Sequence, residues 1–431
     1  MKKIREGYKI TEFGEIPEEW NIGSIDELTT FIKSGLSRNL KDENVGIPCI
    51  RSNNIVNGRI NYNDLKYWFL KDDKGANIED YILNDGDVLV NFINSMAQIG
   101  KTCIYRSNGR DAIYTTNIFR VNFNKDKILN EYFYYFSQTD RYKKEIELIT
   151  KPAVNQASFT TVDFKKIKLA IPIIKEQERI VSILSTVDEQ IDNVDALIEK
   201  NKELKKGLMQ TLLTKGIGHT KFKKTEIGEI PEEWTLVKIG DVAKFQAGYA
   251  FKSSDYVDNG VKLVKITNVQ QKDLLWNDTD FLPEEFLNKY KEYSLEINDV
   301  IIAMTRPIIS SGIKICKVKK EDTPALLNQR VGRFITSENV NNKYLYQYCF
   351  SNYFINKVNE LCSTTGQPNI SSNQLESIMI SLPSTEEQEK IGSILLNVDE
   401  KMEEYENKKQ RLEELKKGLM QQLLTGNIRI I

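Results

Sequence analysis

The single histidine of this 431-residue chain, His219, limits the chemistry that the chain can perform. Catalytic triads, zinc hydrolases and most general-base mechanisms need at least one well-placed imidazole. His219 lies in KGIGHTKFKK, a segment typical of a flexible connector, so we expect a solvated linker residue rather than a catalytic one. The acidic residues show no spacing that would hold a metal ion, so we predict neither a nuclease centre nor a metal site.

The five cysteines are odd in number and scattered, and none stands in a Cys-x-x-Cys pair. This pattern argues against a disulfide framework and against a thiolate zinc site. We therefore expect reduced and mostly buried thiols at Cys49, Cys103, Cys316, Cys349 and Cys362.

One segment, SMAQIGKT from Ser95 to Thr102, imitates a phosphate-binding loop that follows a strand-like run. Its first glycine is replaced by Ser95, and the corresponding SSGIKIC stretch near Gly312 lacks the Lys-Thr pair. A nuclease or ATPase that uses this loop is the enzymatic alternative. The sequence has no Asn-Pro-Pro-aromatic tetrapeptide and no GxGxxG, so we expect no methyl transfer by this chain alone.

Composition describes a cytoplasmic protein of more than one domain. The chain is 40% hydrophobic and 28% charged, and no apolar run is long enough to cross a bilayer. The opening MKKIREGYKITEFGEIPEEW has no apolar stretch behind its basic residues, so we expect no signal peptide there. The formal charge is −1, so any DNA binding must use local basic patches or charge from partners.

An internal repeat divides the chain into two similar halves. TEFGEIPEEW from Thr11 recurs as TEIGEIPEEW from Thr225, and LKKGLMQTLLT from Leu204 recurs as LKKGLMQQLLT from Leu415. IKLAIPIIKEQERIVSIL from Ile167 likewise matches IMISLPSTEEQEKIGSIL from Ile378. Between these blocks the halves agree only loosely. We therefore predict a pseudo-twofold molecule that presents two different surfaces on one scaffold.

Each half ends in a segment with the pattern of a long helix. Apolar residues follow steps of four and three from Ile180 to Ile198, and again from Ile391 to Tyr405. Each helix is expected to continue to about Leu213 or Leu424, and the two are expected to pack antiparallel. Pro172 and Pro383 close the preceding strands, and Ser384 with Glu387 has the spacing of a capping box.

Three polar or small residues interrupt this helical pattern. Asn201 occupies a seam position where the second copy has Leu412, and it either fixes the helix register or sits at a fraying edge. Gly207 and Gly418 stand inside the helices, where glycine costs roughly 1 kcal/mol relative to alanine. Either another helix approaches closely or the helix kinks there. Beyond them, apolar partner-docking surface is expected at Met209, Leu212, Met420 and Leu423.

The less similar regions before the helices predict a mixed α/β (α+β) fold. Strand-like runs begin at Gly46, Asp87, Val261 and Asp299, and glycine-centred polar turns surround Gly35 and Gly248. The predicted domains 1 and 2 are residues 1–172 and 222–383. The helical regions are residues 173–221, with a linker, and residues 384–431.

Side chains that suit base edges or phosphates cluster in the loops of both domains. Arg and Lys pair with guanine, and Asn and Gln pair with adenine. The candidates for base contact in the first domain are Arg38, Arg51, Asn53, Asn54, Asn91, Asn94 and Gln156. Those in the second domain are Tyr249, Lys252, Lys265, Thr267, Asn268, Thr305, Arg306 and Gln367. The candidates for phosphate contact are Lys101, Lys151 and Lys314.

The paired GEIPEEW segments, the IPIIKEQERIVSIL and LPSTEEQEKIGSIL helix starts and the LKKGLMQ-LLT helices resemble the specificity subunits of Type I restriction-modification systems. The resemblance covers nearly the whole chain. It implies a non-catalytic subunit in which two target-recognition domains, separated by two antiparallel helices, read a bipartite double-stranded DNA target.

The resemblance also implies that the helices bind two methyltransferase subunits, to which restriction subunits attach. S-adenosylmethionine, ATP and magnesium would then belong to those partners and not to this chain. A coiled-coil scaffold without sequence preference is the remaining alternative, and competition between random and specific DNA would separate it from a sequence reader.

Overall fold

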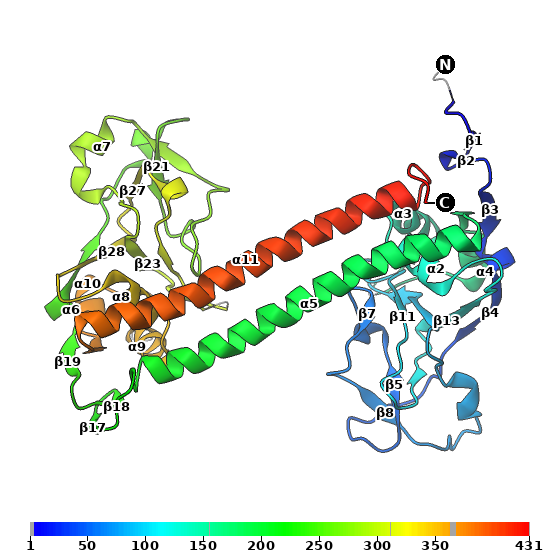
Figure 1. Cartoon of the computed structure of the whole chain (residues 1–431), viewed down its shortest axis with the longest axis horizontal. Helices are drawn as coiled ribbons and strands as arrows, with labels where there is room; N and C mark the ends of the chain where they lie inside the picture. The colour runs from blue at the N-terminus through cyan, green and yellow to red at the C-terminus, as the bar shows by residue number, and fades with distance from the viewer. Residues whose placement is uncertain (1–3, 155, 311, 363–367, 431) are drawn as a thin grey trace. The chain divides into compact units, whose positions relative to one another are not determined.

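A computed structural model describes residues 4–154, 156–310, 312–362 and 368–430. The chain forms two compact units (Figure 1): unit 1 is Met1–Val194 with Lys408–Ile431, and unit 2 is Asp195–Asn407. Each unit therefore holds one mixed α/β domain together with part of each long helix. The predicted four-segment boundaries treat the helical regions as separate parts of the chain, and they stay a prediction.

The two long helices are α5 (Ile174–Leu212) and α11 (Thr385–Leu423), green and orange to red in Figure 1. All six seam residues from Ile180 to Ile198 are buried, as the periodicity predicts. Inside unit 1, Ile180 at the start of α5 shares a core with Leu423 at the end of α11. Inside unit 2 the opposite ends meet, because Leu212 shares a core with Ile391. The predicted antiparallel pairing is confirmed within each unit.

The helix ends also match the sequence signals. The strands β16 (Lys168–Ile171) and β29 (Met379–Leu382) stop directly before Pro172 and Pro383. The amide of Glu387 donates to the Ser384 hydroxyl at 3.3 Å, which is one half of the predicted capping box. Asn201 donates to the Leu197 carbonyl of its own helix at 2.8 Å, so its amide makes a local contact.

Unit 1 is built on a four-stranded antiparallel sheet of order β11-β9-β13-β4 and a three-stranded sheet of order β12-β5-β8. A third, small sheet has the order β10-β15-β14, and β3 pairs with β16 in a two-stranded sheet. The strands of these sheets are β3 (Asn21–Ser24), β4 (Thr29–Ser34), β5 (Ile47–Ile50), β8 (Lys66–Trp68), β9 (Val88–Asn91), β10 (Ile93–Asn94), β11 (Thr102–Ile104), β12 (Ile113–Tyr114), β13 (Ile118–Phe123), β14 (Lys151–Pro152) and β15 (Ala157–Ser158). The remaining elements are the hairpins β1 (Tyr8–Thr11)–β2 (Gly14–Pro17) and β6 (Ile55–Val56)–β7 (Arg59–Ile60), with helices α1 (Ile25–Leu28), α2 (Asn130–Ser137), α3 (Asp140–Ile149) and α4 (Thr161–Lys165).

Unit 2 repeats this plan strand for strand in its two main sheets. The orders are β20-β28-β23-β26 and β22-β21-β27, and β19 pairs with β29. The strands are β19 (Thr235–Lys238), β20 (Ala243–Ala247), β21 (Val261–Val264), β22 (Asp280–Leu282), β23 (Val300–Ala303), β26 (Ile315–Lys317), β27 (Ala325–Leu327) and β28 (Val331–Thr336). The other elements are the hairpins β17 (Phe222–Thr225)–β18 (Gly228–Pro231) and β24 (Ile308–Ile309)–β25 (Gly312–Ile313), with helices α6 (Ile239–Val242), α7 (Phe286–Lys289), α8 (Asn342–Tyr348), α9 (Asn352–Cys362) and α10 (Ser372–Glu376). The mixed α/β prediction is confirmed in both units.

The predicted glycine turns mark close approaches of two backbone segments. A Cβ on Gly35 would lie 2.1 Å from the Tyr114 carbonyl oxygen, and a Cβ on Gly248 would lie 2.4 Å from the Leu327 carbonyl oxygen. No side chain fits at such a distance, so only glycine lets the chain leave the main sheet at this point. The repeat therefore retains glycine for a packing reason in both units.

The repeated tryptophan of GEIPEEW binds a glutamate carboxylate at the start of each long helix. In unit 1 the Trp20 indole donates to Glu176 at 3.0 Å, and Arg429 donates to the same carboxylate at 2.8 Å. In unit 2 the Trp234 indole donates to Glu387 at 3.1 Å, and a His219 ring nitrogen lies 3.1 Å from that carboxylate. These contacts explain why the tryptophan and the helix-start segments recur together.

This arrangement corrects the prediction for His219. The imidazole is largely buried against Trp234 and is held by Glu387, so it is a packing residue and not a solvated linker residue. The composition of KGIGHTKFKK could not predict this burial, because the carboxylate that holds His219 belongs to Glu387, which lies far away in the sequence. The five cysteines are buried, as predicted. Within the described ranges, no helix has the length and apolar character needed to cross a membrane.

Candidate nucleic-acid interface

A small sheet in unit 1 gathers three of the predicted DNA-binding residues. Strand β10 carries Asn94, strand β14 carries Lys151, and both pair with β15, which Gln156 directly precedes. Lys151 and Gln156 are exposed, and Asn94 is partly exposed. The three side chains therefore come from one edge of the domain although 62 residues separate Asn94 from Gln156 in the sequence.

The corresponding edge of unit 2 presents Thr305 and Arg306. Thr305 forms a bridge with Asn369, and the Arg306 amide donates to the Pro368 carbonyl at 2.7 Å. Arg306 is exposed and has a φ of 48°, a left-handed conformation that is uncommon for a side chain of this size. Such strain is often retained at functional positions. Gln367, the remaining candidate of this edge, lies outside the described residues.

Asn54 and Asn268 hold the same turn in both units, and this corrects their assignment to base reading. The Asn54 side chain accepts from the Arg51 amide and donates to the carbonyls of Asn61 and Asp64. Asn268 repeats this pattern with Lys265, Leu275 and Asp278. Both amides are buried and engaged by the local backbone, so they present no group to a ligand.

Asn91 and Lys314 are also buried, which corrects two further predictions. The Asn91 amide donates to the Ser52 carbonyl at 3.2 Å, and the Lys314 ammonium donates to the Ile266 carbonyl. Ser52 and Ile266 occupy equivalent positions, two residues before Asn54 and Asn268. Burial also lowers the pKa of Lys314. A base or phosphate contact by either side chain would require removing it from this internal bond.

Three basic candidates are tied to nearby carboxylates. Arg38 makes a two-point contact with Asp72 at 2.7 and 2.6 Å, and these bonds lower the pKa of Asp72 to about 2. Arg51 and Asn53 both donate to Asp64, and Lys265 pairs with Asp280. To contact DNA, each cation would have to exchange a carboxylate for a base edge or a phosphate.

The remaining candidates are Tyr249, Lys252, Thr267 and Lys101. Tyr249 is 39% exposed and packs on Tyr290, with ring centroids 4.6 Å apart. Sequence reasoning missed Tyr290, whose neighbours Lys289 and Lys291 supply the basic and aromatic mixture that would have signalled it. Lys252 is exposed, while Lys101 follows the turn of Ser95–Thr102 and is partly exposed. That turn runs directly into strand β11, whereas a phosphate-binding loop continues into a helix.

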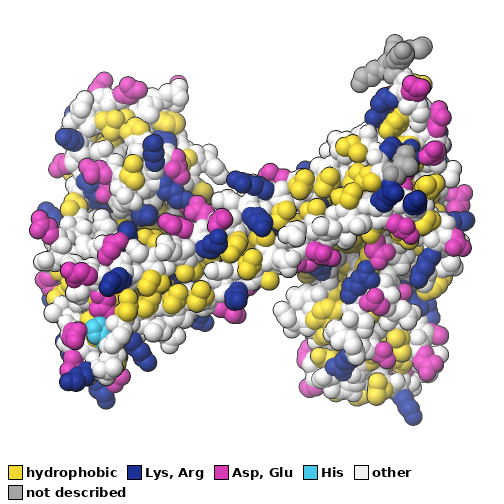
Figure 2. Space-filling view, viewed as in Figure 1, with side chains coloured by type: hydrophobic (Ala, Val, Ile, Leu, Met, Phe, Trp, Pro, Cys, Tyr) yellow, Lys and Arg dark blue, Asp and Glu magenta, His cyan; other side chains and the backbone are white. Residues whose placement is uncertain are grey.

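The partner-docking prediction is corrected on the long helices. Leu212, Met420 and Leu423 are buried in the cores of their own units, and Met209 packs against the core of unit 2. The exposed apolar residues of the repeated segment are Leu204 and Leu415, each 50% exposed. A Cβ added to Gly207 or Gly418 would meet nothing within 4 Å. Neither glycine is therefore required by a neighbour in this chain. Figure 2 shows apolar side chains along the outer faces of the helical segments.

Each unit clamps its domain to the helices through one aspartate. In unit 2, the carboxylate of Asp399 on α11 forms ion pairs with the ammonium groups of Lys205 on α5 at 2.5 Å and of Lys272 at 2.7 Å. It also accepts a hydrogen bond from the Gln347 side-chain amide at 2.9 Å. In unit 1 the equivalent Asp188 receives Lys416 at 2.6 Å and the Tyr135 hydroxyl at 2.9 Å. Burial raises the pKa of Asp399, but Lys205 and Lys272 outweigh it, so the net pKa is lowered.

The charge on Lys205 is costly to bury. Burial lowers its pKa to about 8, although Asp399 acts in the opposite direction. No group of three or more potential metal ligands occurs among the residues that the structure describes.

Comparison with known proteins gives the family. A family model described as the Type I restriction modification DNA specificity domain matches residues 17–204 and 231–416. The chain belongs to this family of Type I restriction-modification specificity subunits. The two matched segments follow the internal repeat.

Curated relatives match over full length. The chain is 34% identical to the Type I restriction enzyme MjaVIII specificity subunit of Methanocaldococcus jannaschii, covering 100% of this chain and 99% of the relative. It is 31% identical to the putative MjaX specificity subunit of the same organism, covering 99% and 97%. A crystal structure of the Type I restriction-modification S subunit from M. genitalium has the same fold, with a TM-score of 0.65, 15% identity and 98% coverage of both chains.

Proposed function

We propose that this chain reads a two-part DNA target, with one part recognised by each unit. The observation that carries the proposal is the contrast within the repeat. The sheet orders, the glycine crossings and the Trp–Glu contacts are the same in both units. The residues at the matching edges differ, with Asn94 and Lys151 in unit 1 and Thr305 and Arg306 in unit 2. A shared scaffold with unlike polar edges suits recognition of two unlike sequences.

The remaining candidates for DNA contact fall into two groups. Exposed or partly exposed side chains without a carboxylate partner in the interactions described above are the first choice for base or phosphate contacts; these are Asn94, Lys101, Lys151, Gln156, Tyr249, Lys252, Thr267, Thr305 and Arg306. Arg38, Arg51, Asn53 and Lys265 are paired in the free chain and would exchange partners on binding. The first group should account for most of the sequence readout.

We infer that the chain itself carries no catalytic centre and acts through partners in the cytoplasm. Two methyltransferase subunits would dock on the helices, one around Leu204 and Gly207 and the other around Leu415 and Gly418. The glycines support this, because each leaves open space on an exposed helical face at a cost in helix stability. S-adenosylmethionine, ATP and magnesium would be bound by the methyltransferase and restriction subunits.

The test is an exchange of one recognition domain. Residues 1–172 are replaced by the equivalent region of another family member, and the methylated motif is read by methylation-sensitive sequencing of the host genome. We expect one half of the motif to change while the other half stays the same. A change in both halves would contradict independent reading. Lengthening either long helix by about four residues should alter the length of the spacer, the unread DNA between the two parts of the target, because α5 and α11 are each continuous through both units. An unchanged spacer would count against this role of the helices.

A further inference from the structure

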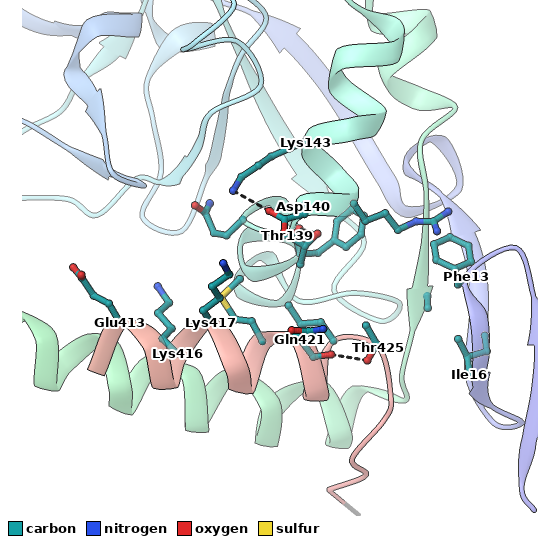
Figure 3. A pocket seen from close by; sticks show the side chains of 16 residues that line it. Phe13, Ile16, Thr139, Asp140, Lys143, Glu413, Lys416, Lys417, Gln421 and Thr425 are labelled. Carbon is teal, nitrogen blue, oxygen red and sulfur yellow. Dashed lines mark hydrogen bonds and ion pairs between the residues drawn. The ribbon is translucent and has the colours of Figure 1, made fainter. Parts of the chain in front are cut away.

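A cavity of about 560 Å³ lies in unit 1 between the end of α11, the start of α3 and the β1–β2 hairpin (Figure 3). Its floor is apolar and is formed by Ile16, Phe136, Met420 and Leu424. Its rim is basic. In Figure 3, Lys416 and Lys417 rise from α11 toward the α3 side, where Lys143 lies.

The repeat shows what occupies the corresponding place in unit 2. Helix α9 matches α3, because its buried Phe354 and Val358 take the positions of Tyr142 and Ile146. At the flanking positions, Arg141 and Lys143 of unit 1 correspond to Tyr353 and Ile355. Both Tyr353 and Ile355 pack against the core of unit 2. Unit 2 therefore covers this position with its own apolar side chains.

Unit 1 lacks these two covering side chains. The Arg141 guanidinium lies over the Phe13 ring at 3.7 Å, and Lys143 is 3.6 Å from Asp140 at the exposed rim. Neither extends an apolar group over the floor in the way that Tyr353 and Ile355 do. Burying one leucine- or phenylalanine-sized side chain there would remove apolar surface from water, which favours binding.

We propose that this cavity receives an apolar side chain from an acidic segment of the methyltransferase subunit. The floor favours the apolar group, and the excess of positive over negative side chains on the rim favours carboxylates beside it. The cavity lining overlaps the proposed docking segment, since Lys417 directly precedes Gly418 on α11 and Met420 lies two residues after it. This inference rests on the proposed function, and it makes the two docking sites of the chain unequal: the site in unit 1 has a cavity to fill.

The experiment is a titration of the full chain with the purified methyltransferase subunit of the same system, followed by calorimetry and native mass spectrometry. Two variants alter the cavity: Lys417→Glu reverses charge at the rim, and the double variant Arg141→Tyr with Lys143→Ile installs the residues of unit 2. Each should weaken one of the two binding events about tenfold and leave the other within threefold. The unaffected event also shows that the variant chain is folded.

Lys74→Glu is the charge-matched control, because Lys74 is an exposed lysine of unit 1 that lies outside the cavity lining and outside both proposed docking segments. It should change either event by less than threefold. Equal effects of Lys74→Glu and Lys417→Glu, or no effect of both cavity variants, would overturn the inference while two-site binding still supports the proposed function. If the unaltered chain bound no methyltransferase subunit, the proposed function itself would fail.

Discussion

The two units build the same scaffold by partly different means. Both join a tryptophan to a helix-start glutamate, but unit 1 completes the contact with Arg429 and unit 2 with His219. In both units a side chain donates a hydrogen bond to the backbone carbonyl two residues before the buried asparagine. The donor is Asn91 in unit 1 and Lys314 in unit 2. The fold therefore fixes which backbone groups must be satisfied and leaves open which side chain does so.

The aspartate clamps should show the largest difference between the units. Asp399→Ala removes a carboxylate that holds Lys205, Lys272 and Gln347, and it leaves Lys205 buried without a partner. We expect a loss of about 4 kcal/mol in the stability of unit 2. The equivalent Asp188→Ala should cost unit 1 about 2 kcal/mol, because Lys416 is more exposed than Lys205.

Hydrogen exchange resolved by segment, under increasing urea, measures each unit in the same full-length chain. Equal losses for the two variants would show that burial of the lysine does not set the strength of the clamp. Lys205→Met combined with Asp399→Ala should recover part of the loss, since the uncompensated charge is then removed.

The helix-start glutamates should give the next largest contrast. Glu176→Ala leaves the Arg429 guanidinium without its main partner, and arginine cannot become neutral. Glu387→Ala removes a less buried carboxylate, because the Glu387 side chain is 14% exposed and the Glu176 side chain is 2% exposed. We expect losses of about 3 and about 1.5 kcal/mol, respectively. Thermal unfolding followed by calorimetry measures both, and the reverse order would contradict this ranking by burial of the carboxylate.

The buried asparagines should behave alike in the two units. Asn54→Ala and Asn268→Ala each leave backbone carbonyls and an amide of the turn without their bonds, at about 2 kcal/mol each. Circular dichroism in urea measures the loss. A variant that kept its stability but changed the methylated motif would restore these residues to the set that reads bases.

The helix glycines should give the smallest effect, and one of opposite sign. Gly207→Ala and Gly418→Ala add a methyl group in open space within a helix, so each should stabilise the isolated chain by about 0.5–1 kcal/mol. Each should also weaken binding of a methyltransferase subunit if a partner helix approaches there. A gain in stability with unchanged partner binding would leave the glycines without the proposed role.

The sequence predicts the long helices accurately, because an apolar seam, a proline before each start and a capping serine are local signals. The sequence also predicts the strands that follow Gly46 and Asp299, because a strand-like run is a local signal too. It cannot separate a reading asparagine from a buried one: Asn53 and Asn54 are adjacent, yet only Asn54 is buried. The role of Met420 also depends on contacts with the β1–β2 region, which lies about 400 residues earlier in the sequence.

The division of the helices also has a consequence for synthesis on the ribosome. Unit 2 is one continuous stretch, whereas unit 1 needs residues 408–431 to complete its core. At 5–20 residues per second, residues 195–407 take roughly 10–40 s to emerge. During that interval Ile180 and Leu184 have no Leu423 or Leu424 to cover them. Nascent unit 1 should therefore be the aggregation-prone half and the half that depends on chaperones, although it is made first.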